Sequence, residues 1–217
     1  VVAANSTGTG SARLSLAATS YGSSGQAIFA YGIQSGTSVN KSNKVSNTGG
    51  VSSDTSGVGT ARHELGASPF GGDKGIFAFG YSNTVGSNQN VSNIVSNTGV
   101  ISSDQSGVGT ARGGLAAAQF GDRCIFGYGA GGGPSNLVSN TGVVASDVSI
   151  VGTGRIGVAG APYGGTKGLF AFGANGTTYY AMSNLVSTSG VIASDTSAVS
   201  GVTIRAQVNG AGYSISA

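Results

Sequence analysis

An internal repeat constrains the fold of this 217-residue chain more than any other feature of its sequence. Four segments of the form Ser-Asn-x-Val-Ser begin at Ser42, Ser92, Ser135 and Ser183, and each leads into apolar residues and an acidic turn. Copies of one pattern at intervals of 43 to 50 residues are typical of proteins that stack a single supersecondary unit, because each unit buries its apolar face against its neighbours.

Each repeat also has a second half, made of an arginine, a segment of small residues and a run that ends in an aromatic residue and a glycine. The small-residue segments are 65–71, 115–121 and 158–164, and the closing runs are 76–80, 125–129 and 169–173. The first 32 residues correspond to this second half alone. The last unit starts well at Ser183 and then degrades, with Arg205 ten residues after Asp195 instead of the usual eight.

The apolar runs are short, rich in Val, Ile, Phe and Tyr, and bounded by Gly, Ser, Asn and Asp, which favours strands and turns. The chain has 41 glycines and no convincing helical periodicity, so it is predicted to be all-β. Four strands in about 48 residues fit one β-propeller blade. We expect a single propeller domain over residues 1–217, with a half unit at 1–32 and units at 33–80, 81–129, 130–173 and 174–217, the last degenerate at its end.

The two incomplete ends suggest how such a ring closes. Joining residues 8–32 to the unit that starts at Ser183 gives four blades and removes open sheet edges, which invite aggregation. Roughly residues 198–217 are then an extra strand or the start of another domain. If the last unit forms its own second half instead, the chain has four blades and a partial fifth. The chain starts at Val1 without Met, so a processed product or a fragment is expected.

The recurrent small and aromatic residues are assigned to packing. Strands near the propeller axis or in face-to-face contact need short side chains, as in residues 116–118 and 159–161. Aromatic residues then fill the gaps between blades, because each buries a large apolar area. An ordinary β-sandwich core is the alternative, and the fixed period argues against it. The expected gap-filling residues are Phe29, Phe77, Phe79, Phe126, Phe170 and Phe172.

The aspartates and arginines that recur in the units admit two interpretations. They could form a ring of charges that binds a ligand, or they could hold the fold. In the second case each Asp accepts backbone N–H groups of its own turn, and each Arg pairs with an Asp or caps strand carbonyls. A residue needed in every unit is usually architectural, so this set is interpreted as structural: Asp54, Asp104, Asp147, Asp195, Arg13, Arg62, Arg112 and Arg155.

The units differ most in sequence and length in the connectors after the closing runs. These connectors are residues 33–41, 81–91, 130–134 and 174–182. Repeat proteins place such variable insertions on one face, where loops carry binding residues. Tyr179 and Tyr180 are the best candidates for stacking on a sugar, with packing between blades or subunits as the alternative. The candidate ligand-binding residues are Tyr179, Tyr180, Asn175, Asn88, Asn90 and Tyr81.

Composition excludes several classes of function. A single Cys and a single His exclude a disulfide framework, a cysteine zinc cage and a multi-histidine metal site, so no cofactor and no metal are expected. The formal net charge is +3, but the basic residues do not cluster as in nucleic-acid binders. No run of about 18 apolar residues is present, so no membrane insertion is expected.

Several short motifs approach catalytic patterns without completing them. The glycine-rich segment 129–135 lacks the Lys and the helix of a phosphate-binding loop, and segment 52–60 resembles the Asp-box turn of sialidase-like propellers with one residue inserted and the Trp missing. The non-repeated acids Glu64, Asp73 and Asp122 are scattered over different units. His63 and Glu64 form an isolated pair that we interpret as solvent-facing, and Cys124 is expected to be buried and inert. An enzyme is not expected.

The sequence resembles two kinds of repeat protein. The string GTAR–xxLAAA–aromatic-Gly–turn–IFxYG resembles a kelch-type blade, although YG or FG replaces the glycine pair and the spaced Trp is absent. Segments 135–147 and 107–129 look more like a repeat of virion and tail-fibre-like proteins of tailed bacteriophages. This resemblance covers nearly the whole chain and weakens after about Ser197.

The phage resemblance implies a non-enzymatic structural virion protein, such as a tail fibre, a tail-tip component or a capsid decoration that contacts the host surface. Its partners would be other virion proteins and further copies of itself. The alternative is a secreted or surface lectin-like propeller, extracellular, that binds glycans through its variable connectors.

Overall fold

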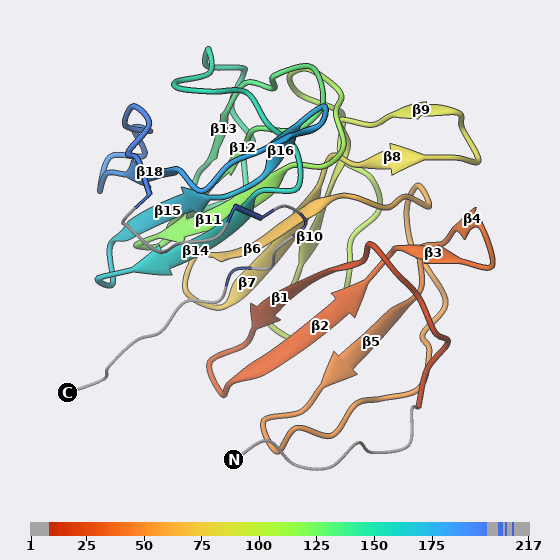
Figure 1. Cartoon of the computed structure of the whole chain (residues 1–217). Coiled ribbons are helices and arrows are strands. Elements are labelled where there is room, and N and C mark those ends of the chain that lie inside the picture. Colours follow the sequence, from red (N-terminus) through yellow and green to blue (C-terminus); the bar gives the residue numbers. More distant parts are fainter. Residues whose placement is uncertain (1–8, 199–203, 206, 208–209, 211–217) are drawn as a thin grey trace.

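The computed structural model describes residues 9–198, 204, 205, 207 and 210, and within them it is entirely β-structure with no helix (Figure 1). Four three-stranded antiparallel sheets follow one another along the chain. Unit 1 contains β1 (Ala17–Tyr21), β2 (Gln26–Ala30) and β5 (Ser42–Val45); unit 2 contains β6 (Gly66–Phe70), β7 (Lys74–Ala78) and β10 (Ser92–Val95). Unit 3 contains β11 (Ala116–Phe120), β12 (Arg123–Gly127) and β13 (Asn136–Val138); unit 4 contains β14 (Ala159–Tyr163), β15 (Lys167–Ala171) and β18 (Ser183–Val186).

A fourth, irregular segment lies along the outer edge of each sheet. In unit 1 it runs from Val51 to Thr55, which bridge to Val45 and Ser42 of β5. The same two bridges recur in the other three units. Each sheet therefore has three strands where the sequence predicts four, and an edge segment held by two isolated bridges lies at the place of the predicted fourth strand.

Three units carry a small two-stranded hairpin after the middle strand. These hairpins are β3 (Ile33–Gln34) with β4 (Thr37–Ser38), β8 (Tyr81–Ser82) with β9 (Ser87–Asn88), and β16 (Ala174–Asn175) with β17 (Thr178–Tyr179). They form at three of the four variable connectors. In unit 3 the shorter connector makes a tight turn at residues 130–132 instead.

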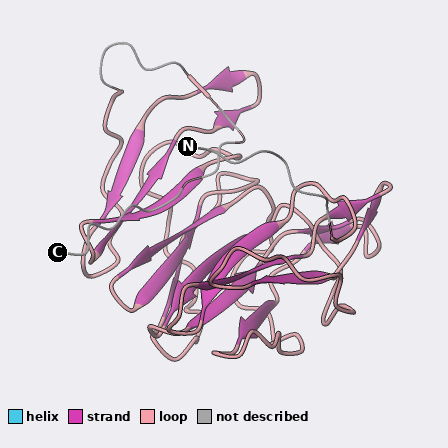
Figure 2. Ribbon diagram, turned by 90° about the horizontal axis from the view of Figure 1, so that it is seen from below, coloured by secondary structure: helices cyan, strands magenta, loops and turns pink. Residues whose placement is uncertain are grey.

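The four sheets pack face to face in the order in which they follow along the chain (Figures 1 and 2). Their first strands pack in sequence, β1 on β6, β6 on β11 and β11 on β14, and we call them the inner strands. Small residues allow this approach, because a Cβ on Gly160 would collide with the carbonyl oxygen of Ala117. All four inner strands line one cavity of about 520 Å³. The prediction that the small-residue strands lie in face-to-face contact is confirmed.

Three apolar clusters fill the spaces between neighbouring sheets. Phe77, Phe126 and Phe170, at the same position of units 2, 3 and 4, each reach back toward the preceding unit and are fully buried. The equivalent Phe29 of unit 1 is 38% exposed because no unit precedes it in the structure. The aromatic residues therefore fill gaps between units as predicted, except at the two ends of the array.

Each middle strand ends in a corner formed by an aromatic residue and a glycine. Tyr31, Phe79, Tyr128 and Phe172 all have φ between 63° and 66°, and the glycines after them have φ between 106° and 108°. A bulky residue adopts positive φ only where its surroundings impose it. Here the corner turns the chain outward and directs the ring toward the next unit.

The strand pairing differs from the expected closure of the ring. β1 pairs with β2, β2 pairs with β5 of the same N-terminal stretch, and β18 pairs with β15. The prediction that residues 8–32 share a blade with the segment at Ser183 is therefore wrong. The physical reason is that each unit begins near the Ser or Thr two residues before its Arg and takes its outer strand from the following stretch of chain. Residues 11–55 therefore supply all three strands and the edge segment of unit 1.

A fifth unit begins at the C-terminal end of the described chain. The N–H of Gly173 donates to the carbonyl of Arg205 over 2.8 Å, as Gly129 does to Arg155 over 3.1 Å. Gln207 donates to Gly157 as Gly157 does to Gly114, at 2.9 Å in both cases. Of the two blade counts left open by the sequence, this register favours four units and a partial fifth. The expectations for 1–8, 199–203, 206, 208–209 and 211–217 lie outside the described residues.

Candidate functional site

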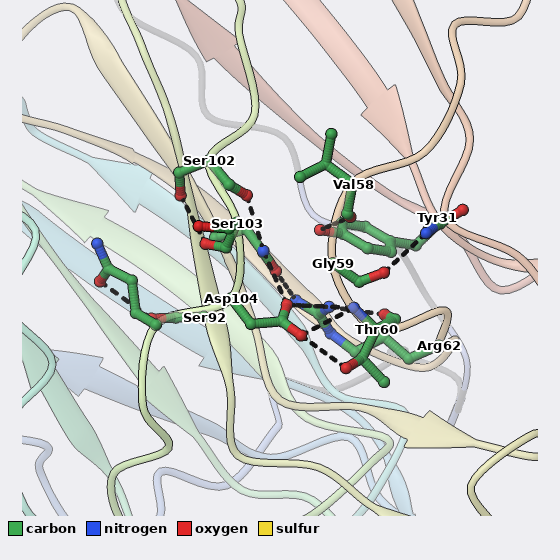
Figure 3. Close-up of polar contacts among 12 residues, drawn as sticks. Tyr31, Val58, Gly59, Thr60, Arg62, Ser92, Ser102, Ser103 and Asp104 are labelled. Carbon is green, nitrogen blue, oxygen red and sulfur yellow. Dashed lines mark hydrogen bonds and ion pairs between the residues drawn. The ribbon is translucent and has the colours of Figure 1, made fainter.

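A hydrogen-bonded cluster around a buried arginine lies at one end of the sheets of units 2, 3 and 4, and Figure 3 shows the cluster of unit 2. In unit 2, Arg62 has no exposed surface. Its Nε donates to the Phe79 carbonyl at the end of β7 over 2.8 Å, and its Nη1 donates to the Thr60 carbonyl over 3.0 Å. Its Nη2 donates to Oδ1 of Asn93 on β10 over 2.7 Å. One side chain thus ties the start of the unit to its middle and outer strands.

The aspartate at the end of the unit completes the cluster. Asp104 accepts hydrogen bonds from the N–H and the hydroxyl of Thr60, at 2.9 and 2.6 Å, and from Nδ2 of Asn93 at 2.9 Å. Its carboxylate lies 4.0 Å from Nη1 of Arg62. Because Thr60 precedes Asp104 by 44 residues, these bonds join the first and last segments of one unit.

The same bonds recur in units 3 and 4. Arg112 donates to Tyr128, Thr110 and Asn136, and Arg155 donates to Phe172, Thr153 and Asn184, over 2.6 to 3.0 Å. Asp147 and Asp195 accept from the equivalent threonine and asparagine. In these copies every nitrogen of the guanidinium is engaged inside the unit, which fits the interpretation of this Asp and Arg set as structural.

The details differ from the sequence interpretation in two respects. Each Asp accepts from the distant threonine or serine of its own unit, not from its own turn. Each arginine of units 2, 3 and 4 caps two backbone carbonyls, as one of the expected alternatives has it, and also donates to an asparagine that was not expected. Asp and Arg residues eight apart belong to adjacent units. The central asparagines were not singled out, although each is the second residue of the repeated Ser-Asn pair that defined the repeat: Asn43, Asn93, Asn136 and Asn184.

Each complete cluster also contacts the aromatic corner of the preceding unit. The guanidinium carbon of Arg62 lies 4.2 Å from the centre of the Tyr31 ring, Arg112 lies 4.1 Å from Phe79, and Arg155 lies 4.3 Å from Tyr128. The same rings meet Phe77, Phe126 and Phe170 edge-on at 5.3 to 5.5 Å. The structure therefore contains three copies of one interface between units.

Burial and hydrogen bonding shift the pKa values of these groups in consistent directions. Partial burial raises the pKa of Asp104, but the hydrogen bonds from Thr60 and Asn93 outweigh it and hold the pKa below its usual value. Asp147 and Asp195 have lowered pKa values for the same reasons. Burial lowers the pKa of Arg112 to about 10 and raises the pKa of Tyr128 to about 12.

The copy in unit 1 is incomplete. Nη2 of Arg13 contacts Asn43, but its buried Nε and Nη1 have no hydrogen-bond partner among the described residues. Asp54 accepts from Ser11 and Asn43 and forms an ion pair with Lys41 at 3.2 Å. No described aromatic ring covers Arg13. A surface hollow of about 750 Å³ opens beside it, lined in part by Leu16, Phe29 and Val51.

The predicted ligand-binding residues lie on or beside two hairpins. Tyr179 of β17 is 52% exposed, Asn175 of β16 is exposed, and Tyr180 is half-buried. Tyr81 and Asn88 face each other across β8 and β9 and are half-buried. Asn90 donates to the Gly109 carbonyl over 2.7 Å, as Asn40 does to Gly59, so it ties its unit to the segment that leads into the next one.

The hairpins of units 1 and 2 are joined to each other. The N–H of Ser38 donates to Oδ1 of Asn83 over 2.7 Å, and Nδ2 of Asn83 donates to the Gly36 carbonyl over 2.6 Å. His63 is buried, with Nδ1 3.0 Å from the Ser38 hydroxyl and its ring against Tyr81. The expectation of a solvent-facing His63 is therefore wrong, because the two neighbouring hairpins cover it.

Other candidate groups have structural surroundings. Cys124 lies on β12 and is fully buried, as predicted, and burial raises the pKa of its thiol to about 12. Within the described ranges, no three His, Cys, Asp or Glu residues are grouped to hold a metal ion. None of the described residues belongs to a helix long and apolar enough to cross a bilayer.

Comparison with known proteins gives no relative: no protein-family model matches the chain, and no curated protein matches it.

Proposed function

We propose that this chain is a non-enzymatic structural protein of a tailed-phage virion, as a tail fibre, a tail-tip component or a capsid decoration. It would act in many copies beside other virion proteins, and its variable hairpins would contact the host surface. The phage assignment rests on the resemblance of the repeated sequence segments. The structure does not test this resemblance.

One observation supports a scaffold that presents variable loops. The Arg-Asn-Asp cluster and its aromatic cover use the same atoms in units 2, 3 and 4, whereas the segment after each middle strand differs in length and conformation. A fixed framework with variation at one repeated position separates stability from recognition, so the hairpins can change without cost to the core.

We further propose that the four sheets are blades of a β-propeller. Their inner strands surround a common cavity, their sheets lie face to face, and each interface repeats the one before it. Closure of the ring would then cover the residues that units 1 and 4 expose within the described part of the chain.

Quantitative mass spectrometry and electron microscopy of purified particles test the virion proposal. A defined copy number per particle, matching a symmetric position in the density, is the expected result. A chain that stays in the soluble fraction and never co-purifies with particles contradicts it. For host contact, particles carrying Tyr179→Ala should adsorb more slowly to cells, with Val143→Ala, an exposed residue in a turn of unit 3, as the matched control.

The lectin-like alternative is supported by the exposed ring of Tyr179, because aromatic faces stack on the apolar faces of sugars. A glycan array with the wild-type chain, Tyr179→Ala and Tyr180→Ala separates the two. Binding that both variants lose supports glycan recognition at β17. Binding that neither variant changes removes this site, and no binding by the wild type removes the lectin alternative.

A further inference from the structure

At each end of the described array, one face exposes residues whose equivalents are buried between units. On unit 1, the N-terminal face consists of Leu16, Phe29 and Val51 around Arg13. Val51 is 44% exposed, whereas its equivalents Ile101 and Ile192 are each 8% exposed. Phe29 is likewise exposed where the equivalent residues of the other units are fully buried. This surface has the residues of an interface, and none of the described units covers it.

On unit 4, the C-terminal face consists of Tyr163, Leu169, Phe172 and Leu185. Ile28, Ile76 and Ile125, the equivalents of Leu169, are at most 1% exposed, whereas Leu169 is half-buried. Phe172 is half-buried where Tyr31, Phe79 and Tyr128 are covered by the next unit. Leu185 is 44% exposed beside it. This surface is the counterpart of the first.

The internal interfaces show what each face binds. In all three, the surface of one unit that corresponds to the C-terminal face meets the surface of the next unit that corresponds to the N-terminal face. At each contact an aromatic ring lies over an arginine and meets a phenylalanine edge-on. We propose that the C-terminal face of one copy of this chain docks onto the N-terminal face of a second copy, continuing the array head to tail.

Arg13 shows what the N-terminal face lacks. In units 2, 3 and 4 the guanidinium lies under an aromatic ring and donates through Nε to its own corner carbonyl. The described part of unit 1 supplies no such ring, and Nε and Nη1 of Arg13 have no partner there. Docking would place Phe172 of the second copy over Arg13 and bury Phe29, which restores both features of the internal interface.

The start of the fifth unit competes for the C-terminal face. Arg205, Gln207 and Gly210 lie where Arg13, Ser15 and Ala18 of a second copy would lie. Gly210 lies so near Gly160 that a Cβ on it would collide with the Gly160 carbonyl oxygen. Docking therefore requires this segment to move aside, and a side chain at position 210 would favour that movement.

A head-to-tail contact joins two different surfaces, so it forms a ring if the rotation closes and a filament if it does not. It also makes a prediction that a symmetric contact does not. A copy disabled on one face should still bind a copy disabled on the other. This proposal extends the multi-copy role suggested above, but it can be tested on the isolated chain without particles or glycans.

The test uses sedimentation velocity on the full chain at concentrations up to about 100 µM. Wild type should associate with increasing concentration, and Phe29→Asp and Leu185→Asp should each be monomeric. An equimolar mixture of the two variants should form a 1:1 dimer and stop there. Val85→Asp, on the hairpin of unit 2 and 60% exposed, is the control and should behave as wild type.

Gly210→Val provides a second measurement that does not depend on the face variants. It should lower the concentration at half-association at least tenfold, since it removes the competing segment. Val51→Asp and Leu169→Asp replace the first pair if either variant shows an altered circular dichroism spectrum. The proposal is overturned if both wild type and Gly210→Val stay monomeric, if the mixed variants do not combine, or if only the unit 1 variants abolish association.

Discussion

The clusters around Arg62 and Arg13 are built from the same residue types, yet only one of them is complete. Both arginines follow a hydroxyl residue by two positions, and both contact the asparagine of the outer strand. Arg62 also lies under Tyr31 of the preceding unit and uses all three of its nitrogens, whereas Arg13 has no ring above it and two unused nitrogens. In the described chain the complete clusters are those under a ring of the preceding unit, so we expect that cover by this unit helps to order the arginine.

The strongest way to break this comparison is to remove each arginine. Arg62→Ala should lower the free energy of unfolding by about 4 kcal/mol, because it opens a buried cavity and leaves the Phe79 carbonyl and Asn93 without their donor. Arg13→Ala should cost less than about 1 kcal/mol, because its side chain is only half-buried and makes fewer bonds. Urea denaturation followed by circular dichroism measures both.

Arg112→Ala serves as the matched control, since its cluster has the same bonds in unit 3. Its cost should match that of Arg62→Ala. If Arg13→Ala and Arg62→Ala lowered the free energy of unfolding equally, cover by the preceding unit would contribute nothing to the stability of the cluster.

The second prediction compares one phenylalanine in a closed interface with its equivalent on an open face. Phe126→Ala should destabilise the fold by about 3 kcal/mol, because its fully buried ring packs between Phe79 and the backbone of Gly66. Phe29→Ala should cost about 1 kcal/mol or less for the monomer. Thermal unfolding at low protein concentration measures the difference, and a cost for Phe29→Ala equal to that of Phe126→Ala would mean that unit 1 is covered in solution.

The repeat predicted much of this arrangement, and the predictions that were wrong have physical reasons. Period, small residues and apolar runs identified the all-β units and the packing strands, because these patterns are local. The pairing of the ends was wrong because the sequence shows the period but not where a unit starts. That point is set by Thr60 reaching Asp104 across 44 residues, which no local pattern reveals.

For the candidate site, the structural role of the repeated aspartates and arginines stays a prediction. The capping of carbonyls by the arginines matches the structure, whereas the turn N–H groups expected as partners of the aspartates do not. Arg62 and Asp54 are eight apart and belong to different units, so their spacing along the chain does not show which groups bond. The asparagines could have been found, since a polar residue repeated within an apolar strand needs a buried partner. Burial of His63 could not have been found, because it depends on the contact between two hairpins that differ in sequence.

The third prediction sharpens the comparison at the asparagine that both clusters share. Asn93→Ala should lower the free energy of unfolding by about 2 kcal/mol, because it leaves Nη2 of the buried Arg62 and one oxygen of Asp104 without a partner. Asn43→Ala should cost about 1 kcal/mol, since the half-buried Arg13 can turn to water. A larger loss for Asn43→Ala than for Asn93→Ala in urea denaturation would reverse the ranking of the two clusters.

The smallest effect expected is a dependence of stability on acidic pH. The folded-state pKa values of Asp54, Asp104, Asp147 and Asp195 lie below that of an unfolded Asp, about 3.9. Their ionised forms are therefore favoured by folding, and the stabilisation is fully present above pH 3.9 and is lost as the pH falls through the folded-state values. The midpoint of thermal unfolding should be constant near neutral pH and decrease below about pH 4.

Asp104→Asn should reduce this acid-induced decrease by the contribution of one aspartate. It should also lower stability at pH 7, because the amide cannot accept from Thr60 and Asn93 as an ionised carboxylate does. An unchanged acid profile in Asp104→Asn would mean that the repeated aspartates do not gain their stability from ionisation, and the completeness of a cluster would then depend on the arginine and its aromatic cover alone.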